Sequence, residues 1–125
     1  MNESKPEQLT SFPSVITSLP RADIHVEGAR AWILQSEASQ LVFFEFEATA
    51  IVPEHSHTYP QWGIVVDGKM ELVVDGEPWM CDKGTEYLIP AGAKHFARFL
   101  SQTRVMDYFS EKSRYKPKAK TDNAK

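Results

Sequence analysis

The sequence has little of what marks secreted or membrane-spanning proteins. Cys81 is the only cysteine among 125 residues, so an internal disulfide is excluded and a packed thiol is expected. No apolar run is long enough to cross a bilayer, and residues 1–8 are polar rather than a charged start followed by an apolar stretch. These absences predict a cytoplasmic protein with no membrane partner.

The sequence also lacks a strong excess of charge. Its net charge is −3, and its 14 lysines and arginines are dispersed apart from the C-terminal tail, so there is no basic footprint for nucleic acid. The hydrophobic fraction of 42% is sufficient for one core in a chain of this length. We therefore predict one folded domain over residues 21–112, a flexible N-terminal segment over 1–20, and a basic tail over 113–125.

No helix of ordinary length is indicated, and the apolar pattern is that of short β-strands. The apolar and β-branched runs are 31–34, 41–46, 62–66, 70–74, 87–89, 95–100 and 105–109. Asp67-Gly68 and Asp75-Gly76 lie between such runs, and each predicts a hairpin turn. Many short strands without a helical pattern predict an all-β sandwich or barrel.

Several prominent side chains have expected structural roles. The phenylalanines of 43–46 are expected in the core or a dimer face, with Glu45 and Glu47 alternating as solvated positions. Trp32 and Trp79 are both expected to pack in the core, and the lining of a sugar pocket is the alternative for each.

Three histidines and one amide form the principal candidate site. His55 and His57 are two residues apart, so an extended strand directs both side chains to one face. Gln61 follows a short turn and offers an amide oxygen, and His95 opens a later strand after Pro90-Ala91-Gly92. Imidazole suits transition metals, and convergence of these residues predicts one bound divalent ion. In the alternative interpretation each histidine is separate and binds nothing.

These residues resemble the two motifs of the cupin superfamily. The first motif is matched by Thr49 in place of Gly, His55, His57, Gln61 in place of Glu, and Gly68; the second by Gly84, Pro90, Gly92 and His95, with Phe99 in place of Asn. The fifteen residues between the motifs resemble the short spacing of compact bacterial cupins. The resemblance implies a double-stranded β-helix of jelly-roll type, a single domain, and a homodimer, since cupins often pair.

Replacement of the usual cupin Glu by Gln61 has a chemical consequence. Three neutral histidines and an amide leave the charge of a divalent ion uncompensated, so the site favours an anionic ligand. Histidine-rich sites accept nickel, zinc, iron, manganese or cobalt. The bound ion would stabilise developing oxyanion charge.

Asp107 is an acidic residue in an otherwise apolar strand. It shares a face with Phe109, and the strand follows that of His95, so its carboxyl can reach the same cavity. General acid or base chemistry is one interpretation, and a loop hydrogen bond or solvent exposure is the other. Spacing alone does not choose between them.

The chain is also similar to the pectin-degradation cupins of the KdgF type, which linearise unsaturated uronates. The similarity rests on His55-Ser56-His57, Gln61, Asp107, Phe109, Ser110 and Arg114. Arg114 falls one residue later than that pattern places it, which leaves Arg98 or Arg30 as alternatives for binding a substrate carboxylate.

This resemblance implies conversion of a 4,5-unsaturated uronate to the open-chain 4-deoxy-5-keto uronate. Asp107 would move the proton, Phe109 would pack against the sugar, and an arginine would pair with the carboxylate. A metal-dependent dioxygenase and a non-catalytic metabolite-binding cupin are the alternatives, because one barrel hosts many chemistries.

Overall fold

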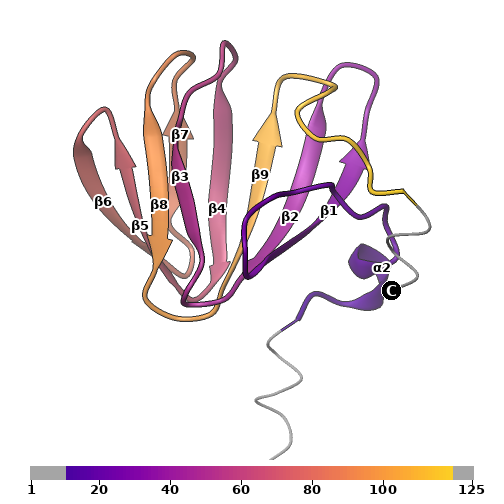
Figure 1. Ribbon diagram of the computed structural model, residues 1–125, viewed down its shortest axis with the longest axis horizontal. Helices are drawn as coiled ribbons and strands as arrows, with labels where there is room; N and C mark the ends of the chain where they lie inside the picture. Colours follow the sequence, from indigo (N-terminus) through magenta and orange to yellow (C-terminus); the bar gives the residue numbers. More distant parts are fainter. Residues whose placement is uncertain (1–10, 120–125) are drawn as a thin grey trace, which may run out of the picture.

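The computed structural model describes residues 11–119, which form two antiparallel sheets packed face to face (Figure 1). The elements are α2 (Ser14–Thr17), β1 (Ala29–Gln35), β2 (Gln40–Phe46), β3 (Ile51–His55), β4 (Gln61–Asp67), β5 (Lys69–Val74), β6 (Glu77–Asp82), β7 (Glu86–Ile89), β8 (His95–Phe99) and β9 (Thr103–Phe109). The five-stranded sheet has the order β1-β2-β9-β4-β7, and the four-stranded sheet the order β3-β8-β5-β6. The predicted all-β, single-domain jelly roll is confirmed.

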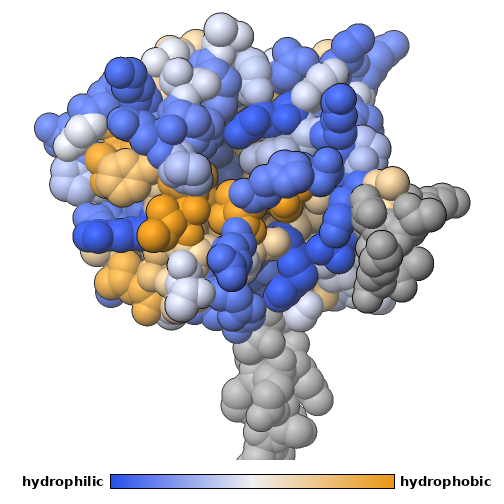
Figure 2. All heavy atoms as spheres, in the orientation of Figure 1, coloured by the Kyte–Doolittle hydropathy of each residue, from blue (hydrophilic) through white to orange (hydrophobic). Residues whose placement is uncertain are grey.

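Alternation along the strands separates the core from the outer faces. In β9, Val105, Asp107 and Phe109 are buried, whereas Tyr108 between them is exposed. Stacked rings join the two sheets, with Phe46 4.2 Å from Phe99 between centroids. Cys81 is buried in the same core, as expected for a packed thiol. On the molecular surface, apolar side chains form a band over β3 and β8, between hydrophilic residues (Figure 2).

Only one of the two predicted hairpin turns is a hairpin. Asp75 and Gly76 both have positive φ, 49° and 83°, and connect the paired strands β5 and β6 as a primed turn requires. The prediction for Asp67-Gly68 is wrong, because β4 and β5 belong to different sheets. Gly68 turns the corner between the sheets with φ of 95°, and a Cβ there would lie 2.3 Å from the carbonyl oxygen of Gln102. An Asp-Gly dipeptide between two apolar runs does not by itself distinguish a hairpin from such a corner.

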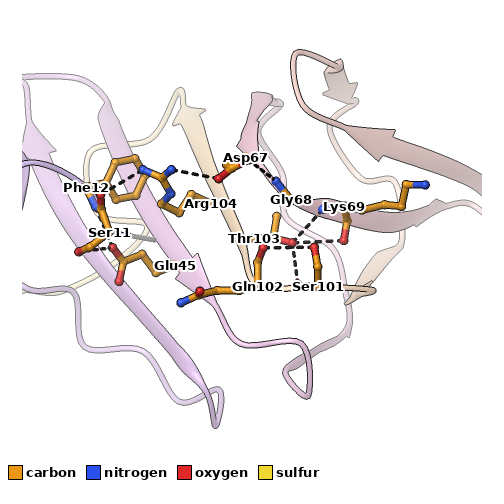
Figure 3. A network of polar contacts seen from close by, with 10 residues as sticks. All are labelled: Ser11, Phe12, Glu45, Asp67, Gly68, Lys69, Ser101, Gln102, Thr103 and Arg104. Atoms are coloured by element: carbon orange, nitrogen blue, oxygen red, sulfur yellow. Dashed lines mark hydrogen bonds and ion pairs between the residues drawn. The ribbon is translucent and has the colours of Figure 1, made fainter. Parts of the chain in front are cut away.

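Glu45 is buried, so its predicted solvated position is wrong. Its Oε2 accepts hydrogen bonds from the Ser11 hydroxyl and the Phe12 amide, both at 3.0 Å (Figure 3). Arg30 donates to the other oxygen at 2.9 and 3.1 Å. The physical reason is that residues 11 and 12 cover this outer face of β2. Glu47, by contrast, is half exposed, as expected.

The second tryptophan prediction is also wrong. Trp32 is buried with Phe12 and Phe43, but Trp79 is 59% exposed on β6, an edge strand of the four-stranded sheet. An edge strand has neighbours on one side only, so alternation does not by itself guarantee burial there.

Both segments that flank the predicted barrel domain pack against it. Phe12 is buried, although residues 11–20 belong to the segment expected to be flexible. After β9, Tyr115 packs edge-on against Phe44 and Phe109, and the amide of Lys118 donates to the carbonyl of Arg21 at 2.7 Å. Residues 1–10 and 120–125 lie outside the described range, and the domain boundaries stay a prediction. Within residues 11–119, no helix has the length and apolar character that a membrane crossing demands.

Candidate metal centre and its surroundings

The three motif histidines lie together at one end of the barrel. His55 ends β3 and pairs in register with His95, the first residue of β8. His57 lies two residues beyond the end of β3, not within the strand as predicted, and its ring centroid is 5.0 Å from that of His95. One ring nitrogen of each histidine lies within 4.8 Å of the others. The three histidines are therefore not separate, and binding of a metal by them stays a prediction.

Backbone carbonyls determine which nitrogen of each ring faces its neighbours. The Nδ1 atoms of His55, His57 and His95 lie 2.9, 2.8 and 2.9 Å from the carbonyls of residues 53, 59 and 93. A carbonyl only accepts, so each Nδ1 carries the proton and each Nε2 presents a lone pair. His95 Nε2 is buried without a hydrogen-bond partner. This is the arrangement that histidines ligating a metal through Nε2 have.

The same burial keeps two of the imidazoles neutral. Desolvation lowers the pKa of His55, with Arg114 and His57 adding to the effect. It lowers the pKa of His95 to about 4, against the opposing hydrogen bond to Ala93. Neutral imidazole is the form that binds a metal ion.

Gln61 supports a cation at this place. It is buried at the start of β4, its Oε1 is 3.2 Å from His57 Nε2, and its amide N–H donates to Asp107. Because His57 Nδ1 carries the proton, the contact between Oε1 and Nε2 brings two acceptors together. A positive ion beside both atoms would relieve that repulsion. The residues present therefore fit a divalent metal, and the alternative of Gln61 as a surface residue is wrong.

Asp107 lies on β9 beside this cluster and is buried rather than solvent-exposed. Tyr87 of β7 donates its hydroxyl to Oδ1 at 2.6 Å. Burial raises the pKa of Asp107 to about 7, although the bonds from Tyr87 and Gln61 and the charge of Arg114 favour the ionised form. Burial also raises the pKa of Tyr87, so the phenol stays a donor. Asp107 can therefore both give and take a proton near neutral pH.

Arg114 is the arginine that reaches the site. Its Nη2 is 3.3 Å from His55 Nε2, and its guanidinium lies 5.6 Å from the ring centroid of Phe109. Arg98 instead pairs with Glu71 on the outer surface, and Arg30 pairs with Glu45. The displacement of Arg114 by one residue in the sequence does not remove it from the cavity.

An interior cavity and an outer groove both adjoin the histidine cluster. An interior cavity of about 60 Å³ has a polar end and apolar walls that include Ile24 and Val26, from the segment that precedes β1. The polar end consists of His55, Gln61, His95, Asp107 and Arg114. An outer groove of about 510 Å³ lies between residues 23–26 and 52–56 and shares His55 and Arg114 with the cavity. A ligand in the groove would therefore reach the histidines past Arg114.

Sequence reasoning missed three residues of this site. Tyr87 looks like an ordinary strand residue, and Gly63 like a glycine of the motif region. A Cβ on Gly63 would lie 2.1 Å from Asp107 Oδ1 and 2.3 Å from the Tyr87 ring. Tyr59 stacks on His57, with ring centroids 4.5 Å apart. Only a glycine inside a strand pattern hinted at such a close approach. Trp62 does not line the cavity, because it faces outward and is 45% exposed.

Known proteins resemble this chain in sequence and in fold. A quercetin 2,3-dioxygenase from Bacillus subtilis is 43% identical over 58 residues, which are 45% of this chain and 17% of that protein. The chain thus spans 17% of the length of this curated relative.

Two solved structures show the same fold over most of the chain. An RmlC-like cupin from Shewanella frigidimarina has 24% identity and a TM-score of 0.72, covering 83% of this chain and 91% of that one. KdgF from Halomonas sp. has 21% identity and a TM-score of 0.67, covering 78% and 91%. The Cupin domain family matches residues 42–109, which contain the three histidines, Gln61 and Asp107. Since this match spans more than half of the sequence, the chain belongs to the Cupin domain family.

Proposed function

We propose that this cupin is a metal-dependent enzyme that opens and tautomerises a 4,5-unsaturated uronate. The observation that carries the proposal is the position of Asp107: a buried carboxyl beside the histidine cluster, in the same cavity as Arg114. A proton carrier, a carboxylate-binding cation and a candidate metal site are the three elements that an isomerisation of a small carboxylated sugar needs.

His55, His57, His95 and Gln61 would hold the ion. When bound, a divalent ion supplies positive charge that stabilises a developing oxyanion. Arg114 would pair with the substrate carboxylate, because its planar guanidinium presents several donors in one fork. Phe109 forms part of the apolar wall of the interior cavity, and the outer groove, which shares His55 and Arg114 with that cavity, has room for a monosaccharide.

The reaction needs two proton movements and no other reactant. Ionised Asp107 takes the proton of the anomeric hydroxyl as the bond from the anomeric carbon to the ring oxygen breaks. The anomeric carbon becomes the aldehyde, and the ring oxygen becomes an enolate at C5. Protonated Asp107 then returns the proton to C4, which produces the 5-keto group. A pKa of about 7 equips one carboxyl for both steps.

The test is turnover of an unsaturated galacturonate monosaccharide. Loss of the C4–C5 double bond and appearance of the keto product would be followed for protein as isolated, after chelation, and after metal reloading. We expect product only with metal, and Asp107→Asn is the matched control because its side chain has nearly the same shape. Absence of product from metal-loaded protein would overturn the proposal.

A dioxygenase is the second candidate, favoured by the 43% identity over 58 residues to quercetin 2,3-dioxygenase. Oxygen consumption with a flavonol, measured under the same metal loadings, distinguishes it from the uronate reaction. Binding of either compound without turnover would instead support a metabolite-binding cupin.

We also propose that the protein acts as a cytoplasmic homodimer. An apolar row crosses the outer face of the five-stranded sheet in register: Leu34, Leu41, Tyr108, Trp62 and Leu88. Four of these side chains are 40–52% exposed, with Leu41 more buried. A second copy would cover them. Light scattering should report a dimer that Trp62→Glu dissociates. Ile51→Glu, which places the same charge at an exposed apolar residue of β3, should leave the dimer intact. A monomeric wild type would contradict the proposal.

A further inference from the structure

Tyr87 and Asp107 approach each other across one glycine. In the five-stranded sheet Gly63 of β4 is opposite Tyr87 of β7 on one side and opposite Asp107 of β9 on the other. A Cβ on Gly63 would collide with both side chains, at 2.1 Å from Oδ1 and 2.3 Å from the ring. Only glycine leaves room for the phenol and the carboxyl to meet over the middle strand.

Asp107 accepts hydrogen bonds from two neutral donors. Tyr87 occupies Oδ1 at 2.6 Å, and the Gln61 amide N–H supplies the second hydrogen bond. The carboxyl is buried, so a rotation that broke the Tyr87 contact would leave a buried polar atom unpaired. Tyr87 therefore restrains the rotation of Asp107.

The orientation of Asp107 then determines that of Gln61. An amide has a donor end and an acceptor end, and the carboxyl of Asp107 accepts the donor end. The acceptor end, Oε1, is consequently directed to His57 Nε2 at 3.2 Å. The contacts form one chain from Tyr87 through Asp107 and Gln61 to the histidine cluster.

We propose that Tyr87 is a positioning residue, which holds Asp107 so that the carboxyl faces the reacting site and the oxygen of Gln61 faces the metal ligands. Its effect on turnover rests on the proposed function, whereas its effect on metal affinity does not. Groups that orient metal ligands from behind typically change metal affinity by about 10–100-fold.

The decisive variant is Tyr87→Phe, which removes one hydroxyl and keeps the ring. We expect metal affinity, measured by calorimetry on apo protein, to fall about 10-fold. With the uronate we expect kcat to fall by a similar factor while KM stays unchanged, because the Tyr87 hydroxyl is already donated to Asp107 Oδ1. Tyr108→Phe is the matched control, since that tyrosine is on β9 next to Asp107 but faces outward.

A double-mutant cycle shows whether Tyr87 acts through Asp107. In an Asp107→Asn background the further change Tyr87→Phe should have little effect on metal affinity. Unchanged metal affinity in the Tyr87→Phe single variant, or equal losses in both backgrounds, would overturn the inference. If wild type binds metal but leaves the uronate unchanged, the proposed function fails, and the affinity cycle still decides the role of Tyr87.

Discussion

Glu45 and Asp107 are two buried carboxylates on paired strands, and they have opposite surroundings. Glu45 is 2% exposed and Asp107 5% exposed. Glu45 lies on the outer face of β2 and is paired with Arg30. Residues 11 and 12 also donate hydrogen bonds to it (Figure 3). Asp107 lies on the inner face of β9, hydrogen-bonded by the neutral Tyr87 and Gln61.

The difference shows how one sheet carries a structural and a chemical carboxylate. A buried charge is tolerable when a cation and several donors compensate it, and Glu45 has both. Asp107 has donors but only the more distant charge of Arg114, so burial raises its pKa to about 7. Glu45 is thus suited to join the N-terminal segment to the sheet, and Asp107 to exchange a proton.

The largest expected effect comes from removing a histidine of the predicted metal site. His95→Ala should lose stoichiometric metal and all metal-dependent turnover while the barrel stays folded, because His95 Nε2 is one of the predicted ligand atoms. Metal content after dialysis and circular dichroism measure the two properties. His25→Ala, at a well-exposed histidine outside the cluster, should keep full metal content. Retained metal in His95→Ala would contradict the ligand assignment.

Asp107→Asn should lower kcat at least about 100-fold, the usual scale for loss of a general acid or base. Steady-state kinetics on metal-loaded protein measure the effect, and metal analysis should show that the ion is retained. Unchanged turnover in this variant would mean that the inner carboxyl has no chemical role.

Glu45→Gln should have the converse result. We expect a loss of about 2 kcal/mol in the free energy of unfolding, because charge-assisted hydrogen bonds become neutral ones and Arg30 loses its partner. The cost is limited because Arg30 is 40% exposed and can be hydrated. Urea unfolding gives the free energy, and kcat should be unchanged. A loss of turnover with unchanged stability would show that the two carboxylates have been assigned the wrong roles.

The smallest effect is the pH dependence of the stability that Asp107 contributes. In the unfolded chain its carboxyl ionises near its ordinary pKa of 3.8, and in the folded protein at about 7. Between these values the folded state binds more protons, so the stability contributed by Asp107 is complete below pH 3.8 and is lost as pH rises toward 7. His95 acts oppositely, since its lowered pKa costs stability as pH falls from 6.5 toward 4.

The contribution of Asp107 to the free energy of unfolding is obtained by subtracting the stabilities of two proteins. The stability of wild type minus that of Asp107→Asn should decrease as pH rises from about 4 to about 7 in metal-free protein, because the His95 contribution is common to both. A flat difference would mean that Asp107 titrates alike in the folded and unfolded states.

Much of the site was predictable because its signals are local. Two histidines separated by one residue, and an acidic residue among apolar ones, stand out along the sequence. The choice among Arg30, Arg98 and Arg114 was not predictable, because each is one of many charged residues and only the fold shows which of them enters the cavity. The burial of Glu45 was unpredictable for a similar reason: the covering residues 11 and 12 are 33 positions or more away in the sequence.

Local sequence patterns predicted seven of the nine strands, all but β3 and β6, together with the single-domain all-β class and the side chains suited to bind a metal. These properties depend on periodicity and on the chemistry of individual residues. Tertiary structure alone decided that Asp67-Gly68 is a corner between sheets and that Tyr87 meets Asp107 over Gly63. It also decided that of two buried carboxylates only Glu45 has a cation as its partner. Such properties depend on which strands become neighbours, and long-range pairing is not written in local spacing.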